Sequence, residues 1–358
     1  WASELKAIEK FYEKKFPLTY DYSAFYDFLT YLYIPTPKTM YEDVFKLEPA
    51  TYLHFNLDSK ILERHQYWSL SVGGCTDDVH TAAQKVKELL KKSVQEQMVS
   101  DVDVGFFLSG GIDSSCVTAI AAKAGHQVKA FSIGFSHKTH DETYFAALVA
   151  TMHEVEHGIE IIDETSVQDS FHRIKDWYDE PFGDTSCFPT YAVSSFARQN
   201  VAVALTGDGA DEIFGGYNWY KDFINIKQFP KFQSTYFKGA LTFVANFGGL
   251  AAKLAKKIEL YFKLDDLEIY TRLLGGMLRE EKESYRILWG LPDDYDDYWY
   301  FRKFYDERLP IFSRLQSLDF HTYLHDDIFT KVDRVSMSVS LECRVPFMKK
   351  ELVEYCFS

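Results

Sequence analysis

The 358-residue chain has few cysteines and no long hydrophobic run, and both shortages exclude whole classes of protein. It has five cysteines, an odd count without a CxxC pair, which is typical of reduced cytosolic thiols and excludes a disulfide scaffold. The longest apolar stretch, 239–252, is interrupted by Asn246 and a Gly-Gly pair and is shorter than the roughly 20 residues of a membrane span. The first residues lack the basic-then-apolar pattern of a signal peptide. We therefore expect a soluble, cytoplasmic protein.

Basic residues are also scarce, because 39 Lys and Arg against 53 Asp and Glu give a net charge of −14. Nucleic-acid phosphates and anionic membranes repel such a chain, so neither is an expected partner. With 46% hydrophobic and 26% charged residues, the composition is that of a globular protein and excludes a disordered or collagen-like chain. At roughly 100–200 residues per domain, the length predicts two domains, or one large domain with an appendage.

The first 70 residues have a β-rich pattern of their own. Two strand-like runs, 50–57 and 60–68, are joined by a turn at Asp58-Ser59 and follow a helix expected over 23–33. Neither element could bury a core alone. We therefore expect residues 1–70 to be the end of a larger β-rich domain, with a linker at 71–74.

Residues 102–205 alternate between short apolar runs and helical periods. We expect strands over 102–108, 128–135, 156–162 and 201–205, and helices over 112–124, 142–152, from Thr165, and over 191–198. This alternation predicts an α/β fold with a doubly wound parallel sheet, whose ligands bind beyond the carboxyl ends of the strands. The chemistry is therefore expected just after Leu108, Phe135, Ile162 and Leu205. Residues 217–310 form a helical extension in which most aromatic side chains are expected to serve packing.

The first predicted strand leads through Leu-Ser-Gly-Gly-Ile-Asp-Ser-Ser, residues 108–115, directly into a helix. Adjacent glycines let successive N–H groups converge at a helix N-terminus, and the serines add hydroxyl donors, a geometry that holds phosphate oxygens. A plain glycine turn is the alternative. The loop lacks the lysine of a Walker A site and is not a G-x-G-x-x-G turn, which disfavours kinase-like phosphoryl transfer and hydride transfer.

A second motif follows the fourth predicted strand, where residues 206–217 are Thr-Gly-Asp-Gly-Ala-Asp-Glu-Ile-Phe-Gly-Gly-Tyr. Its three carboxylates, Asp208, Asp211 and Glu212, would repel one another unless a cation offsets their charge. Mg²⁺ is the expected cation, because it binds carboxylate and phosphate oxygens. A solvated acidic loop is the alternative. A third polar segment, 330–347, decides nothing by itself.

The S-G-G-x-D-S pattern of residues 109–114 resembles the pyrophosphate loop of the adenine nucleotide α-hydrolase class, whose members split ATP between its α- and β-phosphates. Together with the second motif and the K-x-D-R-x-S-M-x-x-S-L-E-x-R-V-P-F stretch at 331–347, it closely resembles the glutamine-hydrolysing asparagine synthetase family. Segment 179–186 is similar to a fourth family motif, and residues 2–6, 33–37 and 46–50 look like the end of the family's glutaminase domain. The resemblance implies the remnant of an α+β glutaminase domain over 1–70 and an ATP-dependent synthetase domain over 71–358.

This resemblance also implies ATP and Mg²⁺ as cofactors. Leu108 and Ile133 would line the adenosine pocket, and Asp113 and Asp211 would bind Mg²⁺. The pyrophosphate part of ATP would contact the glycine loop, which contributes Ser109, Gly110, Gly111, Ser114 and Ser115. A second ATP-contacting pair would be Thr206 and Gly207.

The reaction that the resemblance implies has two steps. The side-chain carboxylate of aspartate attacks the α-phosphorus of ATP and expels pyrophosphate, and ammonia then attacks the aspartyl-adenylate to give asparagine and AMP. Asp208 occupies the position linked to acyl-adenylate formation. Lys331 is the candidate cation for the charged transition state, with Arg334 as its rival.

Two other functions remain open. Related amidotransferases or cyclases adenylate a sugar acid or the precursor of a β-lactam or lasso peptide, and a nucleotide-binding subunit could lack turnover. Small-molecule substrates are expected both of an asparagine synthetase and of these related enzymes. The oligomeric state also stays open, with a homodimer as one option.

The chain departs from the family pattern at both ends. Family members that use glutamine have a nucleophilic cysteine at the N-terminus of the mature chain, whereas this sequence starts at Trp1 and its first cysteine, Cys75, follows the expected linker. It also stops at Ser358, soon after the R-V-P-F motif. We therefore expect these residues to form an amide from free ammonia but not from glutamine.

One further pattern, His153-Glu-Val-Glu-His157, matches the H-E-x-x-H zinc motif. That motif binds metal only on a helix, where positions i and i+4 share a face. Residues 154–161 instead alternate with a period of two, which predicts a strand. Two histidines four residues apart on a strand are separated by about 13 Å, so we expect no shared zinc ion.

Overall fold

The computed structural model describes residues 1–13, 17–136, 141–228, 261 and 263–358. Its central element is a five-stranded sheet in the order β5-β4-β3-β6-β7, in which every neighbouring pair is parallel. The strands are β3 (Val104–Phe107), β4 (Lys129–Phe135), β5 (Glu156–Ile162), β6 (Val203–Leu205) and β7 (Glu342–Arg344). The predicted α/β fold with a doubly wound parallel sheet is confirmed.

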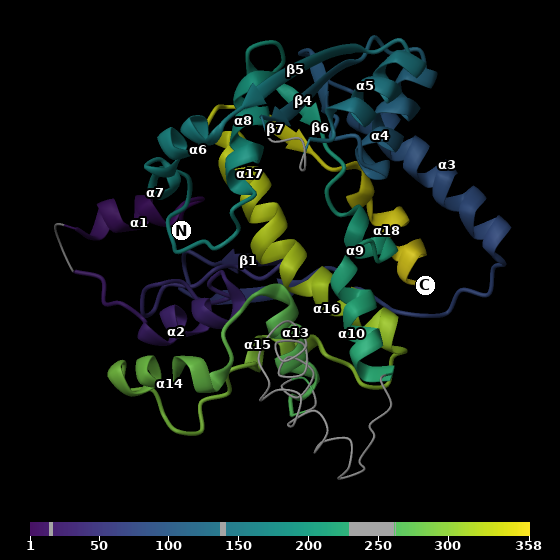
Figure 1. Cartoon of the computed structure of the whole chain (residues 1–358). Helices are drawn as coiled ribbons and strands as arrows, with labels where there is room; N and C mark the ends of the chain where they lie inside the picture. The colour runs from purple at the N-terminus through teal and green to yellow at the C-terminus, as the bar shows by residue number, and fades with distance from the viewer. Residues whose placement is uncertain (14–16, 137–140, 229–260, 262) are drawn as a thin grey trace, which may run out of the picture.

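Helices cover both faces of this sheet. Successive strand residues point to opposite sides, so both faces present apolar side chains for helices to cover. The flanking helices are α3 (Val79–Gln97), α4 (Ile112–Lys123), α5 (Thr143–Met152), α8 (Cys187–Arg198) and α18 (Lys350–Phe357). Helices α3, α4, α5 and α18 share a core with Ala130 and Leu205, whereas α8 packs on Phe131 and Ala204 from the other face. Figure 1 shows α4 and α5 on one side of the strands and α8 on the other.

The strands and helices predicted for residues 102–205 are confirmed to within a few residues. Helix α8 starts at Cys187, four residues earlier than expected, and the helix expected from Thr165 is α6 (Glu164–Phe171). Strand β7 was not predicted, because its residues Glu342-Cys343-Arg344 lack the apolar run that indicated the equally short β6. It becomes a strand by pairing with β6, with Cys343 opposite Ala204.

Beyond the sheet and its flanking helices, the described residues form a largely helical half. The helices of the described residues not yet named, including those that join this half to the sheet, are α1 (Leu5–Tyr12), α2 (Tyr22–Tyr31), α7 (Ile174–Trp177), α9 (Ala210–Phe214), α10 (Asn218–Gln228), α13 (Asp266–Leu274), α14 (Arg279–Leu288), α15 (Trp299–Phe304), α16 (Ile311–His321), a π-helix η2 (Leu324–Phe329), α17 (Thr330–Met337) and the 3-10 helix η3 (Pro346–Met348). Tyr220, Tyr270, Tyr300 and Phe301 are buried in one aromatic core, which confirms the packing role predicted for such side chains. The apolar stretch 239–252 lies outside the described residues. Within the part of the chain that is described, no helix is long and apolar enough to cross a bilayer.

The N-terminal segment forms both of its predicted elements. Strands β1 (Thr51–Phe55) and β2 (Leu62–Gln66) pair as an antiparallel hairpin, and α2 falls within two residues of the expected helix. Helix α2 packs against α13 and α14, and Figure 1 shows these purple and green helices side by side. Its Tyr31 belongs to the aromatic core of the helical half. A domain boundary near residue 70 stays a prediction.

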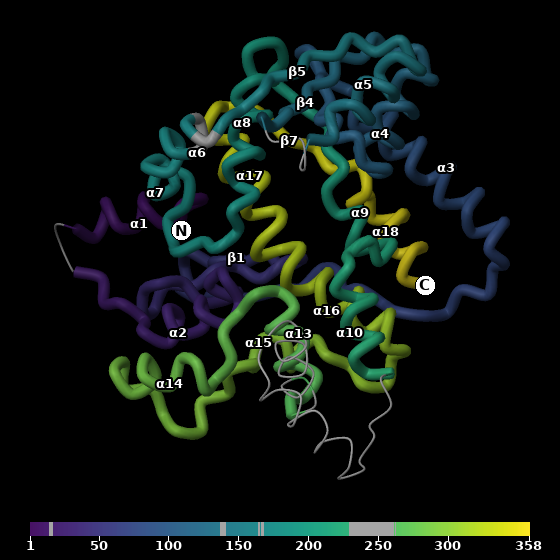
Figure 2. The backbone as a smooth tube through the Cα atoms, in the orientation of Figure 1, coloured from purple at the N-terminus to yellow at the C-terminus, as the bar shows by residue number. Residues whose placement is uncertain are grey.

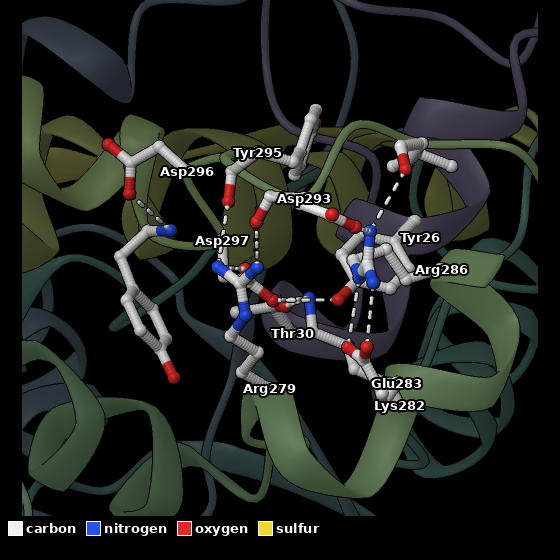
Figure 3. A network of polar contacts seen from close by, with 12 residues as sticks. Tyr26, Thr30, Arg279, Lys282, Glu283, Arg286, Asp293, Tyr295, Asp296 and Asp297 are labelled. Atoms are coloured by element: carbon white, nitrogen blue, oxygen red, sulfur yellow. Dashed lines mark hydrogen bonds and ion pairs between the residues drawn. The ribbon is translucent and has the colours of Figure 1, made fainter.

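A buried polar network holds α2 against the helical half (Figure 3). Lys282 is fully buried, and its Nζ lies 2.8 Å from Asp297 Oδ1 and donates a hydrogen bond to Thr30 Oγ1. The Tyr26 hydroxyl donates to the same Asp297 oxygen at 2.9 Å, and its ring centre is 3.6 Å from the ammonium. Because a buried ammonium is costly unless it is paired, these contacts stabilise the docked arrangement of α2 and residues 279–300.

Helix α17 connects the helical half with the sheet. It continues from the π-helix η2 and packs on α8 and β7. Figure 2 shows its tube running from the neighbourhood of α16 up to the strands. The third sequence motif, which starts on α17, is thereby brought to the edge of the sheet where the other two motifs lie.

Candidate functional site

A pocket of about 630 Å³ opens at the carboxyl edge of the sheet. The chain leaves β3 toward β4 on one side and later enters β6 on the other, so the connections diverge at β3. Doubly wound sheets bind their ligands at such a switch point. Leu108 and Thr206, the residues that follow β3 and β6, both line the pocket. This is the edge at which the sequence predicted the chemistry.

The pocket collects most of the residues that the sequence singled out. Those that line it are Leu108, Ser109, Gly111, Asp113, Ser114, Ile133, Thr206, Gly207, Asp208, Asp211 and Lys331. Gly110, Ser115 and Arg334 are not among its lining residues. The structure thus brings three segments together that are separated by about 100 residues each, while the individual roles of these side chains stay predictions.

The glycine loop between β3 and α4 is tightly constrained. Gly110 has a φ of +92°, and a side chain there would lie within 2.9 Å of backbone atoms at the start of α5, so only glycine fits. Ser114 Oγ accepts a hydrogen bond from Ser109 N at 3.2 Å and lies 3.0 Å from Ser109 Oγ. The loop ends at the N-terminus of α4, where backbone N–H groups without helical partners favour an anion.

The second motif lies directly against the first. A Cβ atom on Gly207 would be 2.8 Å from Ser114 N, so a larger residue would push the two loops apart. Glycine at this position allows the end of β6 to approach the N-terminus of α4. The two loops therefore form one continuous wall of the pocket.

Three carboxylates line this wall: Asp113 on α4, Asp211 on α9, and Asp208 in the turn before α9. Burial raises the pKa of Asp113, and burial together with the charges of Asp113 and Asp208 raises the pKa of Asp211. Within the described ranges, none of the three forms an ion pair with a lysine, arginine or histidine. Their mutual repulsion would be relieved by a cation, and hard carboxylate oxygens fit Mg²⁺.

The protein groups alone do not make a complete metal cage, because no cluster of three or more His, Cys, Asp or Glu side chains in the described part of the chain is arranged to hold an ion. Mg²⁺ normally takes one or two carboxylates together with phosphate oxygens and water. The pair Asp113 and Asp211 fits that pattern. Glu212 does not join them, because it is fully buried, accepts a hydrogen bond from Tyr217 at 2.6 Å and lies outside the pocket lining. The expectation that all three carboxylates of the second motif face one cation is therefore corrected.

Lys331 supplies the positive charge of the pocket. Its Nζ lies 2.9 Å from Asp184 Oδ2 and donates to Ser186 Oγ at 2.8 Å. Burial opposes its charge, but the carboxylates of Asp184 and, further away, Asp208 raise the pKa of Lys331 above its ordinary value. The ammonium is therefore charged and held in one orientation at neutral pH.

Asp327 completes the surroundings of this lysine. It is 3% exposed and lies on the π-helix η2, one helical turn before Lys331. Burial and the neighbouring charge of Asp184 raise the pKa of Asp327 to about 8. These surroundings favour the neutral form of Asp327, and Asp184 is the carboxylate that pairs with the ammonium group of Lys331.

Asp327→Asn should flatten the loss of stability as the pH rises. The pKa of Asp327 is about 8 in the folded protein and about 3.9 in an unfolded chain. A raised pKa in the folded state means that the stabilisation is complete below about pH 4 and is lost as the pH rises through 8. Thermal unfolding between pH 5 and 9 should show a smaller fall in Tm for this variant than for the wild type. The matched control is Asp333→Asn on the exposed side of α17, and equal slopes for Asp327→Asn and wild type would contradict the assignment.

Arg334, the rival cation, points away from the pocket. Its guanidinium lies 2.7 Å from Asp179 Oδ2 and 3.2 Å from Glu4 Oε1, and its Nε donates to Trp177 O at 3.1 Å. All of these partners belong to α1, α7 or their neighbouring residues. Arg334 therefore connects the N-terminal segment to α17, and the structure does not bring it to the reacting edge of the sheet.

Several lining residues had no predicted role. Asp184 and Ser186 belong to the segment 179–186, whose resemblance to a motif was the only signal in the sequence. The aromatic wall is formed by Tyr217 and Trp219, stacked at 3.7 Å, and by Tyr323. Tyr217 ends the second sequence motif, whereas nothing in the sequence separates Trp219 and Tyr323 from the many aromatic residues that pack in the core.

These features define the class of the protein as a doubly wound α/β fold with a glycine loop at a helix N-terminus and an acidic cluster at the switch point. The chain belongs to the asparagine synthase family, whose family model matches residues 85–358. It is 39% identical over 241 residues to a putative glutamine-hydrolysing asparagine synthetase 2 of Methanocaldococcus jannaschii, covering 65% of this chain and 46% of that protein. It is 29% identical over 335 residues to glutamine-hydrolysing asparagine synthetase 1 of Bacillus subtilis, covering 92% and 52% respectively. The chain thus spans about half the length of these curated relatives.

Proposed function

We propose that the chain activates a carboxylate with ATP and joins it to ammonia, converting aspartate, ATP and ammonia to asparagine, AMP and pyrophosphate. The observation that supports this most is a single pocket lined by a glycine loop at a helix N-terminus, by Asp113 and Asp211, and by the buried Lys331. The names of the curated relatives support the same reaction. In the whole protein the ammonia would come from glutamine, which remains part of this proposal.

ATP would lie along the wall formed by the first two motifs. The hydroxyl groups of Ser109 and Ser114 and the N-terminus of α4 would hold the pyrophosphate part, as anions are held at other helix N-termini. Leu108 and Ile133 line the pocket where the adenosine would rest. This arrangement leaves the α-phosphate toward Thr206, Gly207 and the third motif.

The residues around the α-phosphate would perform the chemical step. Mg²⁺ held by Asp113 and Asp211 would neutralise charge on the departing pyrophosphate. Lys331 would stabilise the negative charge that develops on the α-phosphate, and a single electrostatic contact of this kind is typically worth about 3–4 kcal/mol. Asp184 holds the ammonium group of Lys331 in place. Asp208 borders the space in which the acyl-adenylate would form.

The products should be AMP and pyrophosphate in equal amounts. The reason is that the loop lacks the lysine of a Walker A site, and Lys331 of the third motif lines the same pocket, where it would meet the α-phosphate of bound ATP. Incubation with aspartate, ammonium, MgCl₂ and ATP, followed by chromatography of the nucleotides, measures this. Stoichiometric ADP and inorganic phosphate without AMP would contradict the proposal.

A panel of carboxylic acids separates the alternative functions. Exchange of labelled pyrophosphate into ATP that depends on aspartate supports asparagine synthesis. Exchange that depends instead on a sugar acid or on a peptide or β-lactam precursor would keep the adenylation and change the substrate. Tight ATP binding without any exchange would indicate a nucleotide-binding subunit.

A further inference from the structure

The second histidine of the H-E-x-x-H pattern has a place beside the nucleotide loop. His157 lies on β5, as the strand prediction required, whereas His153 lies at the end of α5. The Nε2 atom of His157 is 2.6 Å from Oγ of Ser132 on the adjacent strand β4. Ser132 lines the pocket and is 3% exposed, and its Oγ donates a hydrogen bond to the carbonyl oxygen of Leu108. A chain of polar groups therefore runs from β5 through β4 to the first residue of the nucleotide loop.

The direction of these hydrogen bonds follows from the donor count. A carbonyl oxygen only accepts, so the single hydroxyl proton of Ser132 must point toward Leu108 O. Ser132 Oγ then has only lone pairs for its second contact. The Nε2 atom of His157 must therefore carry a hydrogen atom and donate a hydrogen bond to the serine oxygen. This assigns the tautomer of the neutral imidazole.

The peptide group between Leu108 and Ser109 is the unit that this chain holds. Its carbonyl oxygen accepts from Ser132, and its N–H group donates to Ser114 Oγ at 3.2 Å. Because a peptide group is planar, anchoring it at both ends orients the start of the loop. The next residues, Ser109 to Gly111, are those that face the pyrophosphate in the proposed function.

We propose that His157 is a positioning residue for the nucleotide loop, acting through Ser132 on the Leu108–Ser109 peptide group. This inference rests on the proposed use of ATP and deepens it. His157 polarises the serine hydroxyl by donating to its oxygen, and hydrogen bonds in such a chain strengthen one another. Without the imidazole N–H, Ser132 loses its fixed rotamer, and the loop can turn its first peptide group away from the phosphate-binding orientation.

Two substitutions of His157 provide a matched test. Glutamine places its amide N–H₂ near the position of Nε2, whereas asparagine places it near Nδ1, one bond too short to reach Ser132. Both are polar and fit a half-buried site, so a difference between them reports the hydrogen bond and not the loss of the ring. Equilibrium dialysis of the full chain with Mg²⁺ and ATP gives the Kd without turnover. We expect His157→Asn to weaken ATP binding about 5–10-fold and His157→Gln to stay within about 2-fold of wild type.

The coupling to Ser132 is tested by a double-mutant cycle. Ser132→Ala should weaken ATP binding about 5–10-fold, and adding His157→Asn to it should cause no further loss, because the histidine acts through the serine. In steady-state assays KM for ATP should rise while KM for aspartate stays unchanged. His153→Asn, from the same sequence pattern but on α5, is the control and should bind ATP like the wild type.

The outcomes separate this inference from the proposed function. Equal ATP binding by His157→Asn, His157→Gln and wild type would overturn the positioning role while leaving the proposed function intact. Additive losses in the Ser132→Ala and His157→Asn double variant would also overturn it. Failure of the wild-type chain to bind ATP would overturn the proposed function, on which this inference rests.

Discussion

Replacing Lys331 with methionine should lower kcat for adenylate formation by about 10²–10³-fold. Of the lysines and arginines in the described residues, Lys331 alone lines the pocket. Its ammonium is held by Asp184 and Ser186, so it is charged and oriented before substrates bind. A preorganised cation in a partly buried site needs little reorganisation during the reaction. Removing one such contact typically costs about 3–4 kcal/mol of transition-state stabilisation. Single-turnover formation of AMP, measured at saturating ATP and aspartate, gives the effect on the chemical step.

The variant must be shown to remain folded, because methionine leaves Asp184 without its partner. The pKa of Asp184 is lowered in the wild type despite burial, owing mainly to Lys331, so the carboxyl group should take up a proton more readily in the variant. Combining Lys331→Met with Asp184→Asn removes the unpaired charge and should restore the Tm but not kcat. Recovery of kcat in the double variant would show that the loss came from the buried carboxylate and not from the missing ammonium.

Arg334→Gln is the matched comparison for Lys331→Met. Arg334 pairs with Asp179 and Glu4 outside the pocket, so its removal should lower Tm and leave kcat within a few-fold of wild type. A folded Arg334→Gln protein with a loss of kcat as large as that of Lys331→Met would reverse the assignment of the catalytic cation.

Asp211→Asn and Asp113→Asn should each reduce pyrophosphate exchange by about 10²-fold or more at ordinary Mg²⁺ concentrations. Both side chains line the same wall, on the first turns of α9 and α4, and both are proposed to bind Mg²⁺. An amide oxygen is a neutral and weaker ligand, so the variant would lose Mg²⁺. The charge of the departing pyrophosphate would then no longer be neutralised by the metal. Exchange should recover in part as MgCl₂ is raised, and a titration from 0.1 to about 50 mM measures this.

Neither substitution should destabilise the metal-free protein. Asp211 is repelled by Asp113 and Asp208, and neither Asp113 nor Asp211 forms an ion pair in the described residues, so replacing one of these charges with an amide relieves repulsion. The Tm without Mg²⁺ should stay equal or rise. Near-normal exchange by either variant at 1 mM Mg²⁺ would contradict the metal assignment. A large fall in Tm would instead show that the aspartate supports the fold.

The amino-acid sequence alone predicted the sheet, the hairpin and most of the pocket wall. Periodicity is a local property, and β3, β4 and β5 together with α4 and α5 each follow from a run of 4–12 residues. Once those elements form a parallel sheet, their carboxyl ends must lie at one edge. For that reason Leu108, Thr206 and the residues that follow them could be placed in one pocket before any contact was known.

Tertiary structure decided what depends on contacts between distant segments. Strand β7 exists only through its pairing with β6, and the choice between Lys331 and Arg334 depends on which side of α17 faces the pocket. The hydrogen bond from Lys331 to Asp184 joins residues 147 positions apart. The contact between His157 and Ser132 joins two strands, and no sequence motif marks these two residues as a pair. No local pattern encodes such pairs, because hydrogen-bond geometry is determined by how the elements pack, whereas periodicity determines only which elements form.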